Sequence, residues 1–416
     1  MALINIQQII NEGLCIGCGL CASIFPEKVS IGLSIGGLRP IEKVPLIDEE
    51  FEYLCRVCPG VVHSGMPKKN LSEDVYIDPV WGPIERICAA HASNDSVRYK
   101  SATGGVLTAL AGYLVESNRV DAILHVGSSG LKPYFGHSTI SYTLSEVNEN
   151  CSSIYASTSP LDKIIKVLDE GIRVALVAKP CDISTMRLLA KKDPRVDKYI
   201  PLMLSPFCGG FFPPFAMSNF LKSENVTEEE VESVSYRGNG CPGPTSIKLD
   251  NGSRIEKSYL DFWGKDSSQW HMPWRCRICP DGTGEGADIS TGDTWPECTP
   301  TEEMISNDLG TNTVIARTSK GAELLQLAEE SGYLDIDYEC ISSDMDKLQP
   351  HLAKKKIKAL ARFDGMRSCG QAGLSTVDLR SDLLSQTTSY DEFIKESKGT
   401  AARIKEGKHL DGYKIK

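Results

Sequence analysis

The chain has 416 residues, 41% hydrophobic and 24% charged, with 45 Lys or Arg against 55 Asp or Glu and a net charge of −10. This composition excludes mainly disordered and collagen-like proteins, and the length suits two or three domains. The longest apolar run, residues 106–115, is too short to span a bilayer, and residues 1–10 lack the features of a secretory signal. We therefore expect a cytoplasmic protein, in which 15 cysteines indicate metal or redox chemistry rather than disulfides.

The first cysteine group is Cys15, Cys18 and Cys21, whose C-x2-C-x2-C spacing is typical of ligands to a [4Fe–4S] cluster. The bacterial ferredoxin motif continues with a fourth cysteine and a proline, but here phenylalanine replaces that cysteine. In two-cluster ferredoxins the cysteine before proline ligates the other cluster, so we predict that Cys58, which precedes a proline, is the fourth ligand. Cys55 is the alternative ligand, and a four-cysteine zinc site is the competing interpretation.

The middle of the chain alternates short apolar runs with amphipathic segments. Strands are predicted at residues 120–126, 172–178 and 310–317, and helices at residues 105–117, 160–170, 182–191 and 320–331. This alternation favours an α/β fold with a mainly parallel sheet, or α+β when the whole chain is counted.

The first of these helices is preceded by Ser101, Thr103, Gly104 and Gly105. Hydroxyls, glycines and free N–H groups at a helix start make a plausible phosphate cradle. A plain helix N-cap is the competing interpretation, because Ser and Thr are ordinary capping residues. No glycine motif of the Rossmann or P-loop type occurs, so an ordinary site of those classes has no sequence support.

The second cysteine group is less local. Cys276 and Cys279 form one C-x2-C pair, whereas Cys181 and Cys208 each follow a predicted buried strand. Cys181 also precedes a predicted helix, whose N-terminus favours a thiolate, with the following aspartate able to cap it. These four could close a second [4Fe–4S] site, but Cys181 and Cys208 could equally be unreactive buried thiols. Cys241, in a glycine-rich loop, is an alternative cluster ligand.

The segment at residues 286–295 follows the C-x2-C pair and contains Asp288 and Asp293. Two carboxylates, hydroxyls and an indole at a predicted glycine turn suit the lining of a site for a polar ring. A solvated turn is the alternative.

Together these motifs resemble the coenzyme F420 hydrogenase/dehydrogenase beta-subunit family, which includes 7-hydroxymethyl chlorophyll a reductase and related ferredoxin-dependent iron–sulfur flavoproteins. The resemblance covers residues 15–321. Its motifs are Ser-Ala-Thr-Gly-Gly from residue 101, Lys-Pro-Cys-Asp from 179, Phe-Cys-Gly-Gly from 207, Tyr-Arg-Gly-Asn-Gly-Cys-Pro-Gly from 236, the C-x2-C pair, and Ala-Asp-Ile-Ser-Thr-Gly-Asp-Thr-Trp from 287.

The resemblance implies two kinds of cofactor. FAD would lie near Ser101, Thr103, Gly104 and Gly105, and we also assign Lys179 and Arg237 to the flavin site. The second [4Fe–4S] cluster would be held by Cys181, Cys208, Cys276 and Cys279. The resemblance also supports the N-terminal cluster with Cys58.

This cofactor set implies a ferredoxin-dependent oxidoreductase. Electrons from reduced ferredoxin would pass through two clusters to FAD, which would reduce a conjugated, small organic substrate by hydride transfer. Asp288, Asp293 and His271 are candidate proton donors. The alternative function is an electron-transfer beta subunit of a hydrogenase or dehydrogenase complex, exchanging electrons with coenzyme F420 or ferredoxin. A zinc-stabilised binding module is a third interpretation.

We divide the chain into a ferredoxin-like module (residues 1–75), an FAD and cluster core (76–345) and a basic, mainly helical extension (346–416). Residues 351–416 carry 14 Lys or Arg against 8 Asp or Glu, opposite in sign to the rest of the chain. A basic helix at residues 354–362 could dock an acidic ferredoxin, or lie on the protein's own acidic surface. Nucleic-acid binding is disfavoured by the net charge, and a homo-oligomer is compatible with the sequence.

Overall fold

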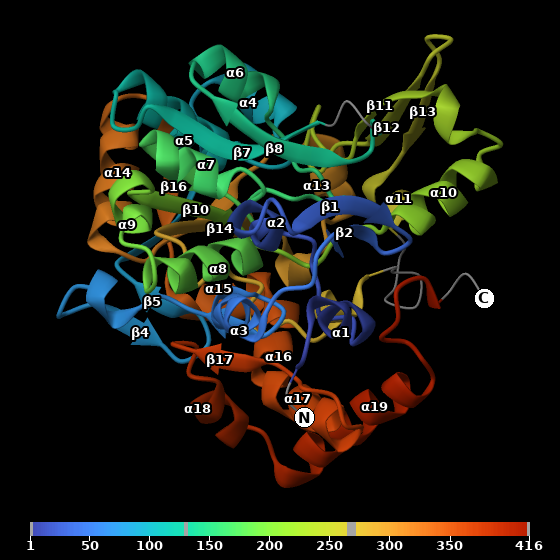
Figure 1. Ribbon diagram of the computed structural model, residues 1–416. Coiled ribbons are helices and arrows are strands. Elements are labelled where there is room, and N and C mark those ends of the chain that lie inside the picture. Colours follow the sequence, from blue (N-terminus) through green and yellow to red (C-terminus); the bar gives the residue numbers. More distant parts are fainter. Residues whose placement is uncertain (1–2, 129–131, 264–271, 414–416) are drawn as a thin grey trace.

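The computed structural model describes residues 3–128, 132–263 and 272–413, and an eight-stranded sheet forms its centre (Figure 1). The strand order is β16-β6-β15-β14-β10-β9-β7-β8. The strands are β6 (Arg86–Ala92), β7 (Ala122–Ser128), β8 (Gly136–Ser141), β9 (Val174–Val177), β10 (Leu202–Pro206), β14 (Ile289–Asp293), β15 (Asn312–Ala316) and β16 (Leu334–Glu339).

The four central strands, β14, β10, β9 and β7, are parallel, with Leu204 opposite Ile289 and Leu202 opposite Ala175. The pairs towards both edges of the sheet are antiparallel. The prediction of a mainly parallel sheet is therefore correct only for its centre. At one edge the reason is the short connection from β7 to β8, which reverses the chain direction without a crossover helix.

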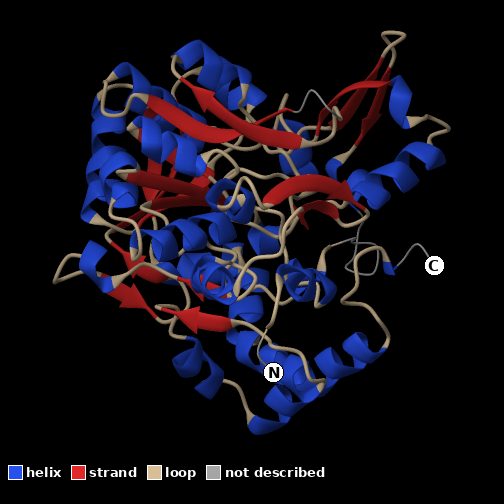
Figure 2. Ribbon diagram, viewed as in Figure 1, coloured by secondary structure: helices blue, strands red, loops and turns tan. Residues whose placement is uncertain are grey.

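Helices cover both faces of the sheet (Figure 2). Ile123 and Ala175 join the hydrophobic cluster that includes α5 and α14, whereas Leu124 and Leu176 join the cluster that includes α7 and α8. Neighbouring residues of one strand thus pack on opposite faces, which makes the sheet a buried middle layer. The helices of this core are α4 (Asp95–Lys100), α5 (Val106–Glu116), α6 (Leu144–Glu149), α7 (Ile164–Glu170), α8 (Pro180–Ala190), α9 (Arg195–Tyr199) and α14 (Ser319–Glu330).

A small antiparallel sheet stands beside the core with an aromatic cluster of its own. Phe262 lies 5.1 Å from Phe212 and 4.9 Å from Phe220, between ring centroids. The loop from residue 236 to 244 leaves this sheet between its first two strands. Its elements are α10 (Pro214–Ser223), a 3-10 turn (Glu228–Glu230), β11 (Val231–Ser235), β12 (Thr245–Leu249), β13 (Arg254–Lys257) and α11 (Tyr259–Trp263).

The N-terminal segment forms helices around one antiparallel hairpin, in which Val29 pairs with Glu42 and Ser34 with Gly37. A second, shorter hairpin follows it. The elements are α1 (Ile6–Asn11), α2 (Leu20–Ile24), β1 (Val29–Ser34), β2 (Gly37–Glu42), α3 (Asp48–Val57), β3 (Val62–Ser64), a 3-10 turn (Lys68–Asn70), β4 (Tyr76–Asp78) and β5 (Gly82–Ile84).

The C-terminal extension is mainly helical, as predicted, but the basic run forms two helices that meet at Lys358. Helices α17 and α19 approach closely, since a Cβ on Gly365 would lie 2.3 Å from the Ser397 carbonyl oxygen. The remaining elements are α12 (Trp274–Arg277), a 3-10 turn (Pro296–Cys298), α13 (Glu302–Asn307), α15 (Ser342–Leu348), α16 (Pro350–Ile357), α17 (Ala359–Ser368), β17 (Ser375–Val377), α18 (Ser381–Gln386) and α19 (Tyr390–Lys405).

The three segments proposed from the sequence share one core. Leu14, Leu176, Phe363 and Ile404 belong to the same hydrophobic cluster, and strand β3 pairs in parallel with β17 of the extension. None of the helices in the described residues has both the length and the apolar character needed to cross a lipid bilayer.

Candidate functional site

A cavity of about 1030 Å³ opens at the carboxyl ends of β9, β10 and β14. Ser101, Thr103, Lys179, Cys208 and Asp293 are among its lining residues, so it brings predicted flavin residues together with a predicted cluster ligand. Ligands of open α/β sheets bind at this edge of the strands. The cavity is also large enough for a cofactor of flavin size.

The cradle at the start of α5 contributes one wall of this cavity. Gly105, at a φ of 78°, is the N-cap, and no side chain caps the helix. Ser101 lines the cavity, and its buried hydroxyl has no hydrogen-bond partner in the part of the chain that the structure describes. The N-cap interpretation of these hydroxyls is therefore wrong, and an anionic group of FAD would fit beside the α5 terminus. Gly104 instead serves packing, because a Cβ there would lie 2.9 Å from the Asn312 nitrogen.

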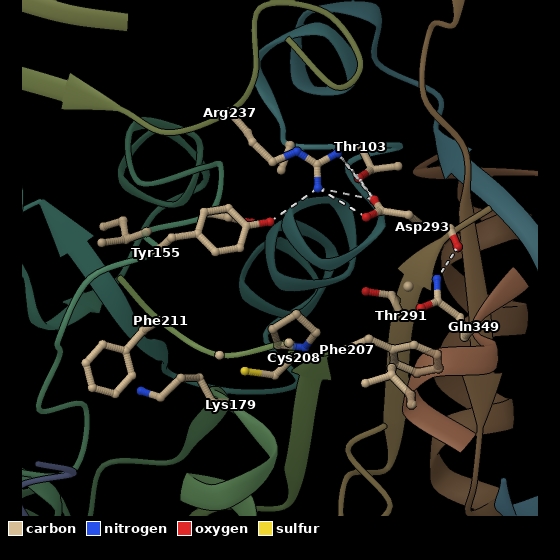
Figure 3. Close-up of a pocket in the computed structure, with 18 of the residues that line it drawn as sticks. Thr103, Tyr155, Lys179, Phe207, Cys208, Phe211, Arg237, Thr291, Asp293 and Gln349 are labelled. Carbon is tan, nitrogen blue, oxygen red and sulfur yellow. Dashed lines mark hydrogen bonds and ion pairs between the residues drawn. The ribbon is translucent and has the colours of Figure 1, made fainter. Parts of the chain in front are cut away.

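Arg237 reaches the same wall from the loop between β11 and β12 (Figure 3). Its guanidinium lies 3.2 Å from an Asp293 carboxylate oxygen, and donates to the Thr103 hydroxyl at 3.1 Å and the Tyr155 hydroxyl at 3.2 Å. It also stands 4.6 Å from the Trp295 ring centroid. Burial opposes its charge, but Asp293 and Tyr155 raise the pKa of Arg237 above its ordinary value. A fixed cation with a stacked aromatic ring thus borders the cavity.

Lys179 lines the cavity at the end of β9. Its ammonium group donates to the Thr158 hydroxyl at 2.8 Å and lies 2.9 Å from a carboxylate oxygen of Asp182. Burial works against the charge, while the Asp182 carboxylate raises the pKa of Lys179. The α8 N-cap is Lys179, so the prediction that Asp182 caps this helix is wrong.

The N-terminal cysteines Cys15, Cys18, Cys21 and Cys58 all line one small cavity, and Cys55 is not among its lining residues. Burial raises the pKa of the Cys58 thiol to about 12. Iron coordination would keep such thiols deprotonated, so four cysteines around one space fit the chemistry of a [4Fe–4S] cluster. Positive φ angles at the intervening glycines, 71° at residue 17 and 89° at residue 19, give the loop its tight curvature.

The second group gathers from three places in the chain. Cys181 lies in the first turn of α8, Cys208 follows β10, Cys276 lies in α12 and Cys279 just after it. Burial, then the charges of Cys276 and Cys279, raise the pKa of Cys208 to about 12, and the Cys208 charge also raises that of Cys181. These electrostatic couplings link Cys208 to each of the other three cysteines.

Among the described residues, no three His, Cys, Asp or Glu side chains are placed to hold a single metal ion. The cluster assignments of both cysteine groups stay predictions. Cys241 is buried and lines neither the large cavity nor the small one, and its assignment as an alternative ligand stays a prediction.

Arg275 joins the two cysteine groups. It precedes Cys276, is 1% exposed, and donates to the carbonyl oxygen of Pro59 at 3.1 and 2.9 Å. Its guanidinium also lies 3.0 Å from the His63 Nδ1. Pro59 follows Cys58, so one buried cation binds the cysteine turn of the first group from the second.

The predicted proton donors are placed differently. Asp293 lines the cavity, where it pairs with Arg237 and accepts from Thr103. Asp288 is 2% exposed and does not line the cavity. It accepts from Arg187 at 3.0 Å and from the Met203 N–H at 2.8 Å, which favours a structural role.

His271 lies outside the described residues. The segment predicted as a glycine turn contains the buried central strand β14. Sequence reasoning missed Tyr155, which has no local motif, and Arg275, whose position beside Cys276 was the available signal.

Two family models match this chain. The N-terminal model of the coenzyme F420 hydrogenase/dehydrogenase beta subunit matches residues 87–166, and the C-terminal model matches residues 171–339. The coenzyme F420-dependent sulfite reductase of Methanocaldococcus jannaschii is 26% identical over 78% of this chain and 47% of its own length. The beta subunit of F420-dependent formate dehydrogenase 1 of Methanococcus maripaludis is 26% identical over 58% of this chain and 59% of its own.

The chain thus spans about half the length of these curated relatives. A chain of the F420-reducing [NiFe] hydrogenase complex from Methanosarcina barkeri shares its fold, with a TM-score of 0.54 and 19% identity over 70% of this chain and 96% of that one. The family models together cover the sheet, the α5 cradle and all four cysteines of the second group. The chain belongs to the coenzyme F420 hydrogenase/dehydrogenase beta-subunit family.

Proposed function

We propose that this chain is an electron-transfer oxidoreductase subunit that exchanges electrons with the deazaflavin coenzyme F420. It would carry FAD in the large cavity and a [4Fe–4S] cluster on each cysteine group, and would act with another redox protein. The observation that carries the proposal is one cavity lined by both the α5 cradle and Cys208. In this arrangement the proposed flavin site would lie beside a candidate cluster ligand.

The relatives favour this function over ferredoxin-driven reduction of another organic substrate. Coenzyme F420 is in the names of the sulfite reductase, the formate dehydrogenase subunit and the hydrogenase subunits that match this chain. Ferredoxin-dependent reduction is the second candidate, because the ferredoxin-type motif at residues 15–21 lies outside both family models.

Bound clusters would supply one-electron transfer, and a bound flavin would exchange electron pairs with an organic partner. The chain's own residues would position these groups. Thr103 and Arg237 are held together by Asp293 on one wall, and Lys179 is held by Asp182 near Cys208. Both cations would favour an electron-rich, reduced ring.

Anaerobic purification with iron, zinc and flavin analysis tests the cofactors. We expect about 8 Fe and about one FAD per chain, since two [4Fe–4S] clusters supply the iron. Zinc without flavin would contradict the proposal.

The coenzyme is tested separately. The dithionite-reduced chain should reduce F420, measured by loss of the coenzyme's visible absorbance. Turnover with reduced ferredoxin and an organic acceptor, but none with F420, would favour the second candidate. Size-exclusion chromatography of cell extract shows whether the chain runs with a larger redox partner.

A further inference from the structure

The C-terminal extension forms part of the large cavity. Lys354, Lys355 and Lys358, from α16 and the residue after it, line the cavity, together with Arg362 of α17 and Arg403 of α19. These helices lie together at the lower end of the molecule in Figure 1, in orange and red. All five residues fall beyond residue 339, where the family match ends.

The cavity lining is basic although the protein is acidic. Among the described residues, eight Lys or Arg line it against three carboxylates, those of Asp293, Glu297 and Glu396. The whole chain has a net charge of −10. The sign of the cavity therefore opposes the sign of the protein, as a site for an anionic ligand requires.

Some of these cations are already neutralised. Arg362 pairs with Glu396 at 2.8 Å, and Lys358 lies 3.9 Å from the same carboxylate. Lys355 donates to the carbonyl oxygen of Gly209 at 3.1 Å, which fixes its ammonium group beside Cys208 without cancelling its charge.

Three further cations make no ion pair with a described carboxylate, although Arg403 is near enough to Glu396 to act on its pKa. No described carboxylate lies within ion-pair distance of Lys354, Lys355 or Arg403. Lys354 and Arg403 are exposed, whereas Lys355 is half-buried. We call these three residues the cationic wall.

We propose that the cationic wall binds the anionic side arm, carboxylate or phosphate, of the exchangeable redox ring that enters this cavity. The inference rests on the proposed function in assuming such a ring. An acidic protein partner is disfavoured because all three cations line the cavity that holds the proposed ring site. The FAD of the proposed function would have the α5 cradle for its own phosphates, where the Ser101 hydroxyl has no described partner.

The test compares FMN with riboflavin, which have the same ring and ribityl chain but differ by one phosphate. Both are bound to the full-length protein with its native flavin retained, and affinities are measured by equilibrium dialysis. We expect FMN to bind about tenfold more tightly than riboflavin at low salt, with a smaller ratio at high salt.

The double variant Lys354→Glu/Arg403→Glu should bring this ratio to about one and leave riboflavin affinity unchanged. The milder variant Lys354→Gln/Arg403→Gln should give a ratio between those of the wild type and the Glu variant. An intermediate ratio would show that the loss of preference does not come from a folding defect. Lys398→Glu is the matched control, because Lys398 is exposed on α19 and is not among the cavity-lining residues. It should keep the wild-type ratio.

Equal binding of FMN and riboflavin by the wild-type protein would overturn the proposal. Loss of the native flavin from the double variant would assign the wall to FAD instead. If the double variant is no longer reduced by ferredoxin but keeps its preference for FMN, the cationic wall would be assigned to a protein partner. Binding is measured without turnover, so this test can fail while F420 reduction succeeds, and the reverse.

Discussion

The two cysteine groups are built in opposite ways. The first takes Cys15 and Cys18 from one loop, Cys21 from the start of α2 and Cys58 from the end of α3, so local spacing predicts most of it. The second collects cysteines from the ends of two parallel strands and from α12, which only the folded sheet brings together. The second group also reaches the large cavity through Cys208, whereas none of the first group's cysteines lines it. Distance along the chain, not distance in space, made the second group hard to predict.

The difference in cavity access predicts different losses of cofactor. Cys279→Ala should reduce iron from about eight to about four atoms per chain and also lower the flavin content, because its neighbour Cys208 lines the flavin cavity. Iron and flavin are measured per chain after anaerobic purification. Cys340→Ala, a buried cysteine in neither group, should change neither value. Full flavin content with reduced iron would show that the second group does not support the flavin site.

A substitution in the first cysteine group should remove the iron of that group and leave the flavin in place. Cys58→Ala is expected to remove about four iron atoms and leave flavin bound, since the Cys58 cavity is separate from the large one. Cys55→Ala is the matched control one helical turn earlier in α3 and should keep its iron. The reverse result would assign the fourth ligand to Cys55.

The link between the groups should matter for stability. Arg275→Met leaves the buried Pro59 carbonyl without its donor, so the free energy of unfolding should fall by about 2–3 kcal/mol. Anaerobic urea titration measures this change. Arg56→Met removes an exposed ion pair with Glu52 and should cost less than about 0.5 kcal/mol. Equal losses of unfolding free energy in the two variants would show that Arg275 does not stabilise the link between the cysteine groups.

The smallest effect is expected from a substitution of Arg237, beside the α5 cradle. Arg237→Lys keeps a charge but loses the guanidinium fork towards Asp293 and Thr103 and the contact with Trp295. Flavin dissociation constants from fluorescence titration should rise about tenfold. Arg254→Lys, exposed on β13 of the same small sheet, should leave flavin affinity unchanged. An unchanged affinity in Arg237→Lys would remove Arg237 from the flavin site.

Much of the core could be predicted from hydrophobic periodicity. The helix predicted at residues 105–117 is α5, that at 320–331 is α14, and the strand at 310–317 is β15. The antiparallel edges could not be predicted, because pairing direction depends on contacts between distant segments. Strand β14 was missed because its glycine and aspartates resemble a turn, although tertiary burial makes it a central strand.

The candidate site was predictable only in part. Local spacing indicated the first cysteine group, and the family resemblance was needed for the second group and the flavin. The role of Tyr155 depends on a partner far along the chain, at Arg237, and no local motif marks it. Arg275 stands beside Cys276, which was a local signal, but its bond to Pro59 follows only from the fold. Lys355 lay in a recognised basic run, but its place beside Gly209 follows from the packing of α16.

The pairing of β3 with β17 has a consequence for synthesis of the protein. Val62, just after the first cysteine group, pairs with Ser375, and Leu14 shares a core with Ile404. At roughly 10 residues per second, these partners leave the ribosome about half a minute after the cysteines do. During that interval the cysteine loop is translated but lacks its final packing. Delivery of iron and sulfide to a nascent chain would therefore meet an open loop, and completion of the extension would close it.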